Sequence, residues 1–251
     1  MAQLASTLGR VEPVTSANPD ERGQLGALHD SVLDTIGREI TGGALRSGDV
    51  LTLDVIQQRF GVSRTVARET MRLLESRGLV TSKRRVGITV QPQSSWNVFD
   101  PKVIWWRLAG PDRDAQLRSL TELRIAVEPL AAAAAARGAS AQQRQQIVEL
   151  AAAMRRHGEA GELDIFLELD IAFHGLLLDA GGNEMFAALT DVVAVVLRGR
   201  TTLGLMPSKP NPAALDLHEA VAAAVAAGSR ADAENAMREL LAEVRDAMTH
   251  S

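Results

Sequence analysis

The chain of 251 residues is long enough for two domains, each able to bury its own core. A hydrophobic content of 46% and a charged content of 23% are those of an ordinary globular protein, not a disordered or fibrous one. The absence of cysteine excludes disulfides, thiol catalysis and zinc fingers. No signal-like start and no membrane-length apolar run occurs, so we expect a cytoplasmic protein with no membrane partner.

The net charge of -4 conceals an uneven distribution of charge along the chain. Between residues 59 and 85 there are eight cations but only two anions, Glu69 and Glu75. Phosphate binding depends on local positive charge rather than on net charge. This segment is therefore the candidate for contact with a polyanion.

The N-terminal quarter begins with residues 1–23, which are polar, contain glycine and proline, and have no apolar period. They predict a disordered tail. From residue 25 to 41 apolar side chains recur every three to four positions, which predicts a helix that the pair Gly42-Gly43 ends. A very short strand is expected near Leu51.

Two short helices joined by a tight turn come next, followed by a basic hairpin. Asp54 is the expected N-cap of a helix over 54–60, and Gly61 its stop. Ser63 is expected to cap a second helix over 64–77. Residues 79–90 then predict a β-hairpin with a basic tip. This order of elements is typical of a chain that presents a helix to a DNA groove.

The segment from Phe60 to Val90 has the pattern F-G-V-S-R-T-x-x-R-E-x-x-R-x-L-E-x-x-G-L followed by a G-x-x-V hairpin. It resembles the winged helix-turn-helix of GntR-type bacterial transcription regulators. The resemblance implies DNA contacts from the recognition helix and the wing, at Arg64, Thr65, Arg68, Lys83, Arg84, Arg85 and Gly87. One departure concerns the loop before the first helix of the motif, where the family usually has Pro-Ser-Glu. This chain has Leu51 to Ile56 there, so a contact from that loop is not expected.

The chain therefore divides into a tail at 1–23, a DNA-binding domain at 24–92, a linker with a connecting helix at 93–114, and a helical domain at 115–249. The three tryptophans of the linker region are expected to pack the joint between the domains, at Trp96, Trp105 and Trp106.

The helical domain carries no strand signal. Helices are expected at 117–136, 141–157, 164–180, 184–200, 213–227 and 230–249. The fold class is thus an α+β winged helix-turn-helix domain followed by an all-α antiparallel bundle. Alanine-rich faces allow close helix approach and favour a homodimer surface as well as a compact core.

Asp170 and His174 stand four residues apart, so they project from one face of a helix. This spacing suits chelation of a divalent metal, and His218 on another helix would supply a third ligand. Taken alone, such a pair is more often a buried hydrogen-bonded pair. Both interpretations stay open at this point.

Four segments resemble the FCD effector-binding domain of the FadR subfamily: E-L-R-I-A-V-E-P from Glu122, L-D-I-A-F-H from Leu169, G-G-N-E-M-F from Gly181 and L-H-E-A-V-A-A-A-V from Leu217. Metal-binding members use one Asp and three His. The fourth ligand would fall at Leu240, so the resemblance implies a three-ligand site for Zn²⁺, Ni²⁺ or Mn²⁺ with open positions.

Arg124 matches the arginine that contacts the effector in this family, and a guanidinium suits bidentate binding of a carboxylate. A salt bridge to Glu128 is an equal alternative, and the two roles are compatible. Weaker candidates for the effector pocket are Asn183, Arg198, Arg200 and Arg245. The segment around Trp96 also resembles the linker of galactonate-operon repressors, which favours a sugar-acid effector.

We thus expect a homodimeric repressor that reads a palindromic operator in double-stranded DNA and is released by a carboxylate or sugar acid. The alternative is a metal-dependent enzyme in the helical domain with a nucleic-acid-binding module. No H-E-x-x-H spacing supplies a general base beside the metal ligands, which counts against catalysis. An activator is also conceivable, because that role depends on the position of the operator.

Overall fold

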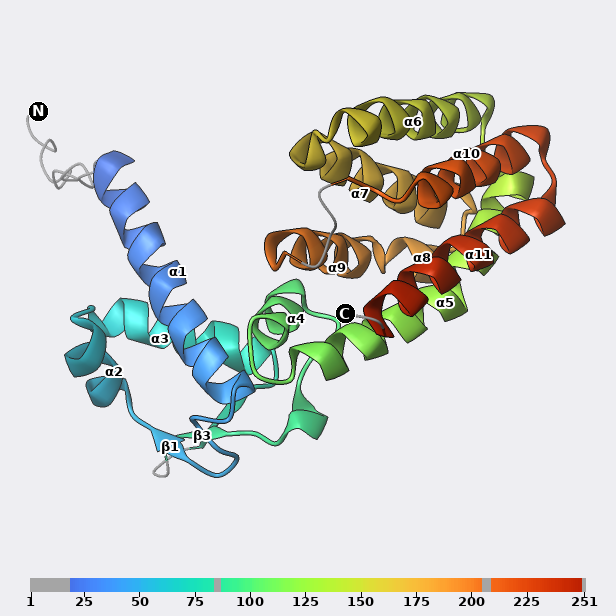
Figure 1. Cartoon of the computed structure of the whole chain (residues 1–251). Helices are drawn as coiled ribbons and strands as arrows, with labels where there is room; N and C mark the ends of the chain where they lie inside the picture. Colours follow the sequence, from blue (N-terminus) through green and yellow to red (C-terminus); the bar gives the residue numbers. More distant parts are fainter. Residues whose placement is uncertain (1–18, 84–86, 205–208, 250–251) are drawn as a thin grey trace, which may run out of the picture.

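The computed structural model describes residues 19–83, 87–204 and 209–249 (Figure 1). Helix α1 (Pro19–Thr41) begins inside the segment for which we expected a tail, so that prediction was wrong for residues 19–23. Proline is favoured at the first helical position because its φ is already helical and its missing N–H would be unpaired there. The remainder of the expected tail lies outside the described residues.

The N-terminal part combines three helices with a small antiparallel sheet. After α1 the elements are β1 (Val50–Leu51), α2 (Leu53–Phe60), α3 (Arg64–Ser76), β2 (Val80–Lys83) and β3 (Gly87–Val90). The strand order in the sheet is β1-β3-β2, with Leu51 opposite Ile88 and Thr81 opposite Thr89. The expected hairpin is therefore present, and the short strand pairs with its second arm.

The turn between α2 and α3 follows from local capping. Gly61 ends α2 in the left-handed region at φ 63°, as expected, and the hydroxyl of Ser63 accepts a hydrogen bond from Val66 N at the start of α3. The N-cap of α2 is Thr52 rather than Asp54, because the extended backbone at Thr52 places its hydroxyl to accept from the first turn. Asp54 lies within that turn instead.

Helix α4 (Pro101–Leu108) contributes side chains to two hydrophobic cores. The indole of Trp106 is fully buried among residues of α1 and α3, and its Nε1 donates to Asp34 Oδ1 at 2.9 Å. Ile104 and Leu108 lie in a different cluster with α5 and α9. The other two tryptophans, Trp96 and Trp105, are partly buried against the same N-terminal core.

The helical part is an antiparallel arrangement in which α5 and α11 lie side by side (Figure 1). After a short 3-10 turn at Gln93–Ser95 and α4, its helices are α5 (Arg113–Gly138), α6 (Ala141–Ala160), α7 (Leu163–Ala180), α8 (Glu184–Ala187), α9 (Thr190–Thr202), α10 (Pro212–Ala227) and α11 (Arg230–Thr249).

The helix expected over 184–200 is two helices, α8 and α9. Phe186 of α8 and Val193 of α9, on either side of the break, both pack in the hydrophobic cluster that contains Leu178. None of the helices within the described residues is both long and apolar enough to cross a bilayer.

The close packing of α1 against α4 predicts that a methyl group added at Gly37 would destabilise the protein. A Cβ on Gly37 would lie 2.6 Å from carbons of the Trp106 indole, which is itself buried. Because overpacking of a filled core is destabilising, we expect Gly37→Ala to lower the free energy of unfolding by ~1–3 kcal/mol. Thermal or urea unfolding measures it, with Ser31→Ala on the exposed side of α1 as the control. An unchanged stability in Gly37→Ala would contradict this packing.

Candidate functional site

Two polar features stand out: an exposed basic face on α3 and a buried polar cavity in the helical part. Arg64, Thr65 and Arg68 are all exposed on the first turns of α3. Arg64 lies 3.7 Å from Asp54, and both side chains are mostly solvent-exposed. No ion partner of Arg68 occurs among the described residues. These side chains are thus accessible to a polyanion.

Other cations of the segment have structural partners. Arg59 is paired with Glu39 of α1, and Arg72 lies 3.5 Å from Glu69 on its own helix. Arg77 donates to Asp100 at 3.1 Å and to the carbonyl of Leu73 at 2.9 Å. Among the described side chains of this segment, the accessible positive charge therefore lies on the first turns of α3.

The wing is only partly described. Lys83 is the last described residue of β2, and Arg84 and Arg85 lie outside the described residues. Gly87 begins β3 at φ 104°, and a Cβ there would lie 2.9 Å from Val50 Cγ1. A glycine is needed at this position because of its backbone conformation and its close approach to β1.

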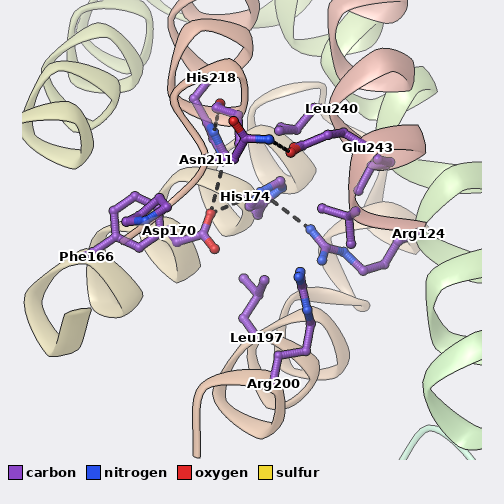
Figure 2. A pocket seen from close by; sticks show the side chains of 14 residues that line it. Arg124, Phe166, Asp170, His174, Leu197, Arg200, Asn211, His218, Leu240 and Glu243 are labelled. Atoms are coloured by element: carbon purple, nitrogen blue, oxygen red, sulfur yellow. Dashed lines mark hydrogen bonds and ion pairs between the residues drawn. The ribbon is translucent and has the colours of Figure 1, made fainter. Parts of the chain in front are cut away.

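The buried cavity has a volume of about 230 Å³ and lies between α5, α7, α9, α10 and α11 (Figure 2). Asp170 and His174 enter it from α7 and His218 from α10. The candidate ligand atoms of these three residues all lie within 4.8 Å of one another. The structure therefore brings together the three residues that the sequence singled out.

The two imidazoles are oriented with Nε2 toward one carboxylate oxygen. Asp170 Oδ1 lies 3.2 Å from Nε2 of His174 and 3.3 Å from Nε2 of His218. The other ring nitrogens face acceptors: Nδ1 of His218 donates to the carbonyl of Ala214 at 2.6 Å, and Nδ1 of His174 lies 2.6 Å from Glu128 Oε2. Histidines that bind metals are typically held in this way through the second nitrogen.

Two buried polar atoms without hydrogen-bond partners indicate whether a metal ion would fit between these residues. Asp170 Oδ1 and His218 Nε2 are buried, yet neither makes a hydrogen bond of acceptable geometry with the described residues. Unpaired buried polar atoms are costly. One divalent cation between the carboxylate and the imidazoles would satisfy both atoms, so this donor set fits a three-ligand site.

The charges around the cluster are strongly coupled. Burial alone would raise the pKa of Glu128, but Arg124 and His174 hold it at about 2. Burial would lower the pKa of His174, but Glu128 and Asp170 raise it to about 9. The pKa of Asp170 is lowered by the two histidines despite its burial. The carboxylates thus stabilise positive charge here, either an imidazolium or a metal ion.

Arg124 is engaged by its neighbour on α5. Its Nε donates to Glu128 Oε1 at 2.5 Å and its Nη2 to Oε2 at 3.3 Å, with both side chains 3% exposed. Its Nη2 also lies 3.4 Å from His174 Nε2. The salt bridge that the sequence suggested is therefore present, and it orients the guanidinium beside the histidine.

Arg200 of α9 lines the same cavity, but its hydrogen bonding differs from that of Arg124. Burial and the charge of Arg124 lower the pKa of Arg200 to about 10. Its Nε is buried and has no hydrogen-bond partner among the described residues. Figure 2 shows its side chain extending toward Arg124. Arg200 thus has donor capacity left for a ligand.

The other candidate effector residues do not line the cavity. Asn183 is exposed and caps α8 by accepting from Met185 N. Arg198 pairs with Glu168 on the outer surface at 2.7 and 2.9 Å. Arg245 is exposed on α11. The helix faces explain this outcome, because Arg198 and Arg200 are two residues apart and point to different sides.

Several lining residues were missed by the sequence reasoning. They come from segments far apart in the chain, at Phe166, Leu197, Asn211, Leu241 and Glu243. Asn211, the N-cap of α10, donates through Nδ2 to Glu243. Leu240 lines the cavity and is 2% exposed, so an apolar side chain occupies the position of the expected fourth ligand. Glu243, three residues later on α11, could have been found from that spacing.

Comparison with known proteins finds related transcription regulators. LutR, an HTH-type transcriptional regulator of Bacillus subtilis, is 30% identical over 84% of this chain and 96% of its own. The galactonate operon transcriptional repressor of Escherichia coli is 27% identical over 76% of this chain and 84% of its own. The solved structure of E. coli McbR/YncC, at 16% identity, shares the fold with a TM-score of 0.52, covering 89% of this chain and 97% of that chain.

Two family models match the two parts of the molecule. The model described as bacterial regulatory proteins, gntR family, matches residues 28–90, and that of the FCD domain matches residues 119–243. The chain belongs to the GntR family of bacterial transcription regulators, in its FadR-type branch with an FCD domain. The matched families and relatives are DNA-binding regulators and not enzymes.

The donor set predicts stoichiometric metal binding. We expect chelator-treated protein to bind one Zn²⁺, Ni²⁺ or Mn²⁺ per chain with a rise in unfolding temperature, because the ion pairs three buried donors. His218→Ala should weaken the affinity at least ~10-fold. His157→Ala is the control, since His157 pairs with Glu162 away from the cavity. Absence of a bound ion by metal analysis and calorimetry would favour the buried hydrogen-bonded cluster instead.

Proposed function

We propose that the protein represses an operon for the catabolism of a sugar acid or related carboxylate, and that the acid releases it from DNA. One observation carries the proposal: a cavity with an unsatisfied arginine, Arg200, beside three potential metal ligands lies in a chain that also exposes a basic recognition helix. The name of the E. coli galactonate operon repressor supports this class of effector.

DNA binding is assigned to the N-terminal part, residues 24–92. Arg64, Thr65 and Arg68 would read base edges from the first turns of α3 in the major groove. The wing residues Lys83, Arg84, Arg85 and Gly87 would contact the backbone or the adjacent groove. A homodimer formed through residues 115–249 would present two such heads to a palindrome, in the cytoplasm, where bacterial DNA lies.

The divalent ion would be held by Asp170, His174 and His218, with open positions for a carboxylate oxygen. Zn²⁺, Ni²⁺ and Mn²⁺ all suit two imidazoles and one carboxylate. The ion would supply positive charge for an acidic ligand. Arg124 would hold His174 and Glu128 in position, and Arg200 would contact the ligand.

A route from the cavity to the DNA-binding head is provided by α9 and α4. Gly199 precedes Arg200, and a Cβ at Gly199 would lie 2.7 Å from Leu108 Cδ1 of α4. The opposite side of α4 inserts Trp106 into the N-terminal core. An effector that favours one arrangement of these helices by ~1–3 kcal/mol would change operator affinity by 5- to 150-fold, as a typical allosteric coupling does.

The exposed arginine on the recognition helix gives a test of the DNA assignment. Arg68→Ala should weaken binding to the operator by ~1–3 kcal/mol if the guanidinium reads a base. Arg118→Ala, which removes the same charge from the exposed surface of α5, is the matched control. Gel-shift or anisotropy titrations at fixed salt measure the affinities. An Arg68→Ala protein with unchanged affinity would refute the assignment of this residue.

Effector release is tested with DNA from upstream of the protein's own gene. Candidate sugar acids, galactonate included, are added to the protein–DNA complex in a gel shift after the protein has been loaded with Zn²⁺. We expect one of them to lower the affinity for DNA at least ~5-fold. Release by none of a broad panel would remove this class of effector from the proposal.

A further inference from the structure

The polar groups of the cavity differ in how far they are already neutralised. The guanidinium of Arg124 is paired with Glu128 through two hydrogen bonds. Arg200 has a buried Nε without a partner among the described residues, and it lines the same cavity. Among the described residues, Arg124 thus has a carboxylate partner, whereas Arg200 makes no ion pair.

The cavity also contains an acid that the metal cluster does not include. Glu243 is half-buried on α11, lines the cavity and accepts a hydrogen bond from Asn211 Nδ2. It lies one turn beyond Leu240, which fills the place of a further metal ligand with an apolar side chain. A carboxylate accepts hydrogen bonds and repels a second anion.

These groups set the charge that a ligand should carry. With a divalent ion at the cluster, the positive charges would be the two of the ion and those of Arg124 and Arg200. The carboxylates of Glu128, Asp170 and Glu243 supply three negative charges. One positive charge remains in this sum. A ligand with one carboxylate would leave the cavity neutral, whereas a ligand with two would leave an uncompensated negative charge in a cavity that already contains the buried carboxylate of Asp170.

We propose that the cavity selects hydroxylated acids with a single carboxylate against the matching diacids, with Arg200 anchoring the carboxylate and Glu243 accepting a ligand hydroxyl and excluding a second carboxylate. This inference rests on the proposed function and narrows its effector class. The cavity of about 230 Å³ is smaller than the ~300–1,000 Å³ of pockets for drug-sized ligands, which fits small acids.

The test uses two pairs of acids that differ at one terminal carbon. Glycerate is compared with tartronate and galactonate with galactarate, where a terminal hydroxymethyl group becomes a carboxylate. Binding is measured by calorimetry and thermal shift on full-length protein loaded with Zn²⁺ and freed of excess ion. In at least one pair we expect the wild-type protein to bind the monoacid at least tenfold more tightly than the diacid.

Substitutions at two residues, Glu243 and Arg200, separate the roles. Glu243→Gln keeps an oxygen toward Asn211 but removes the charge, so the preference for the monoacid should fall to less than threefold. Glu239→Gln, at an exposed position of the same helix, should leave the preference unchanged. Arg200→Gln should lose monoacid affinity at least tenfold, whereas Arg200→Lys should bind more weakly but keep the preference for the monoacid. Unfolding temperatures of all variants establish that each is folded.

Equal binding of both members of each pair by the wild-type protein, or an unchanged preference in Glu243→Gln, would overturn the inference. So would the failure of all four acids to bind. Failure of the proposed function is a distinct result, because it is seen as retention of operator DNA across the broad panel of acids in the gel shift. A monoacid could release DNA although the protein binds the matching diacid equally well. That result would leave the proposed function intact and refute the selectivity.

Discussion

Two carboxylates buried among the helices of the FCD domain, those of Glu128 and Asp170, determine how the surrounding side chains are arranged. Each is removed from water and needs compensating positive charge nearby. Glu128 receives it from Arg124 one turn earlier on α5 and from His174 across the bundle. Asp170 Oδ1 lies within 3.3 Å of Nε2 of both His174 and His218. Five side chains from three helices are thereby linked to one another beside the cavity.

The joint between the two halves of the molecule depends on one short helix. Helix α4 is only eight residues long, yet its successive faces belong to different cores. Trp106 fills the space against Gly37, where a larger side chain would collide, and Leu108 meets Gly199 in the same manner. A pair of glycines on the partner helices thus allows close contact at both ends of the connection. Such contacts transmit displacement because packed interiors resist compression.

The sequence predicted the parts of this structure that depend on local chemistry. Ser63 and Gly61 were confirmed as cap and stop because both act within their own turn. The i to i+4 pair on α7 was confirmed in placement because helix geometry alone brings Asp170 and His174 to one face. The N-cap of α2 was misplaced by two residues, since threonine and aspartate are both good caps and only the backbone conformation decides between them.

What could not be predicted depends on contacts between distant segments. Asn211 and Glu243 are 32 residues apart and meet only because α10 and α11 fold back on each other. Arg200 could be separated from Arg198 only once the buried face of α9 was known. The salt bridge between Arg124 and Glu128 was one of the two compatible roles suggested for Arg124, and its burial became known only from the packing of α5 in the fold.

The hydrogen bond between Arg77 and Asp100 limits which property of DNA binding a ligand in the cavity could change. Arg77 ends the recognition helix and Asp100 caps α4, so the reading surface and the connecting helix are linked side chain to side chain. Asp34 ties Lys102 and Trp106 of α4 to α1 as well. Side-chain contacts therefore tie α1, α3 and α4 to one another. Under the proposed function, in which two chains pair, a ligand in the cavity would alter the distance and angle between half-sites while leaving the base preference of each half-site the same.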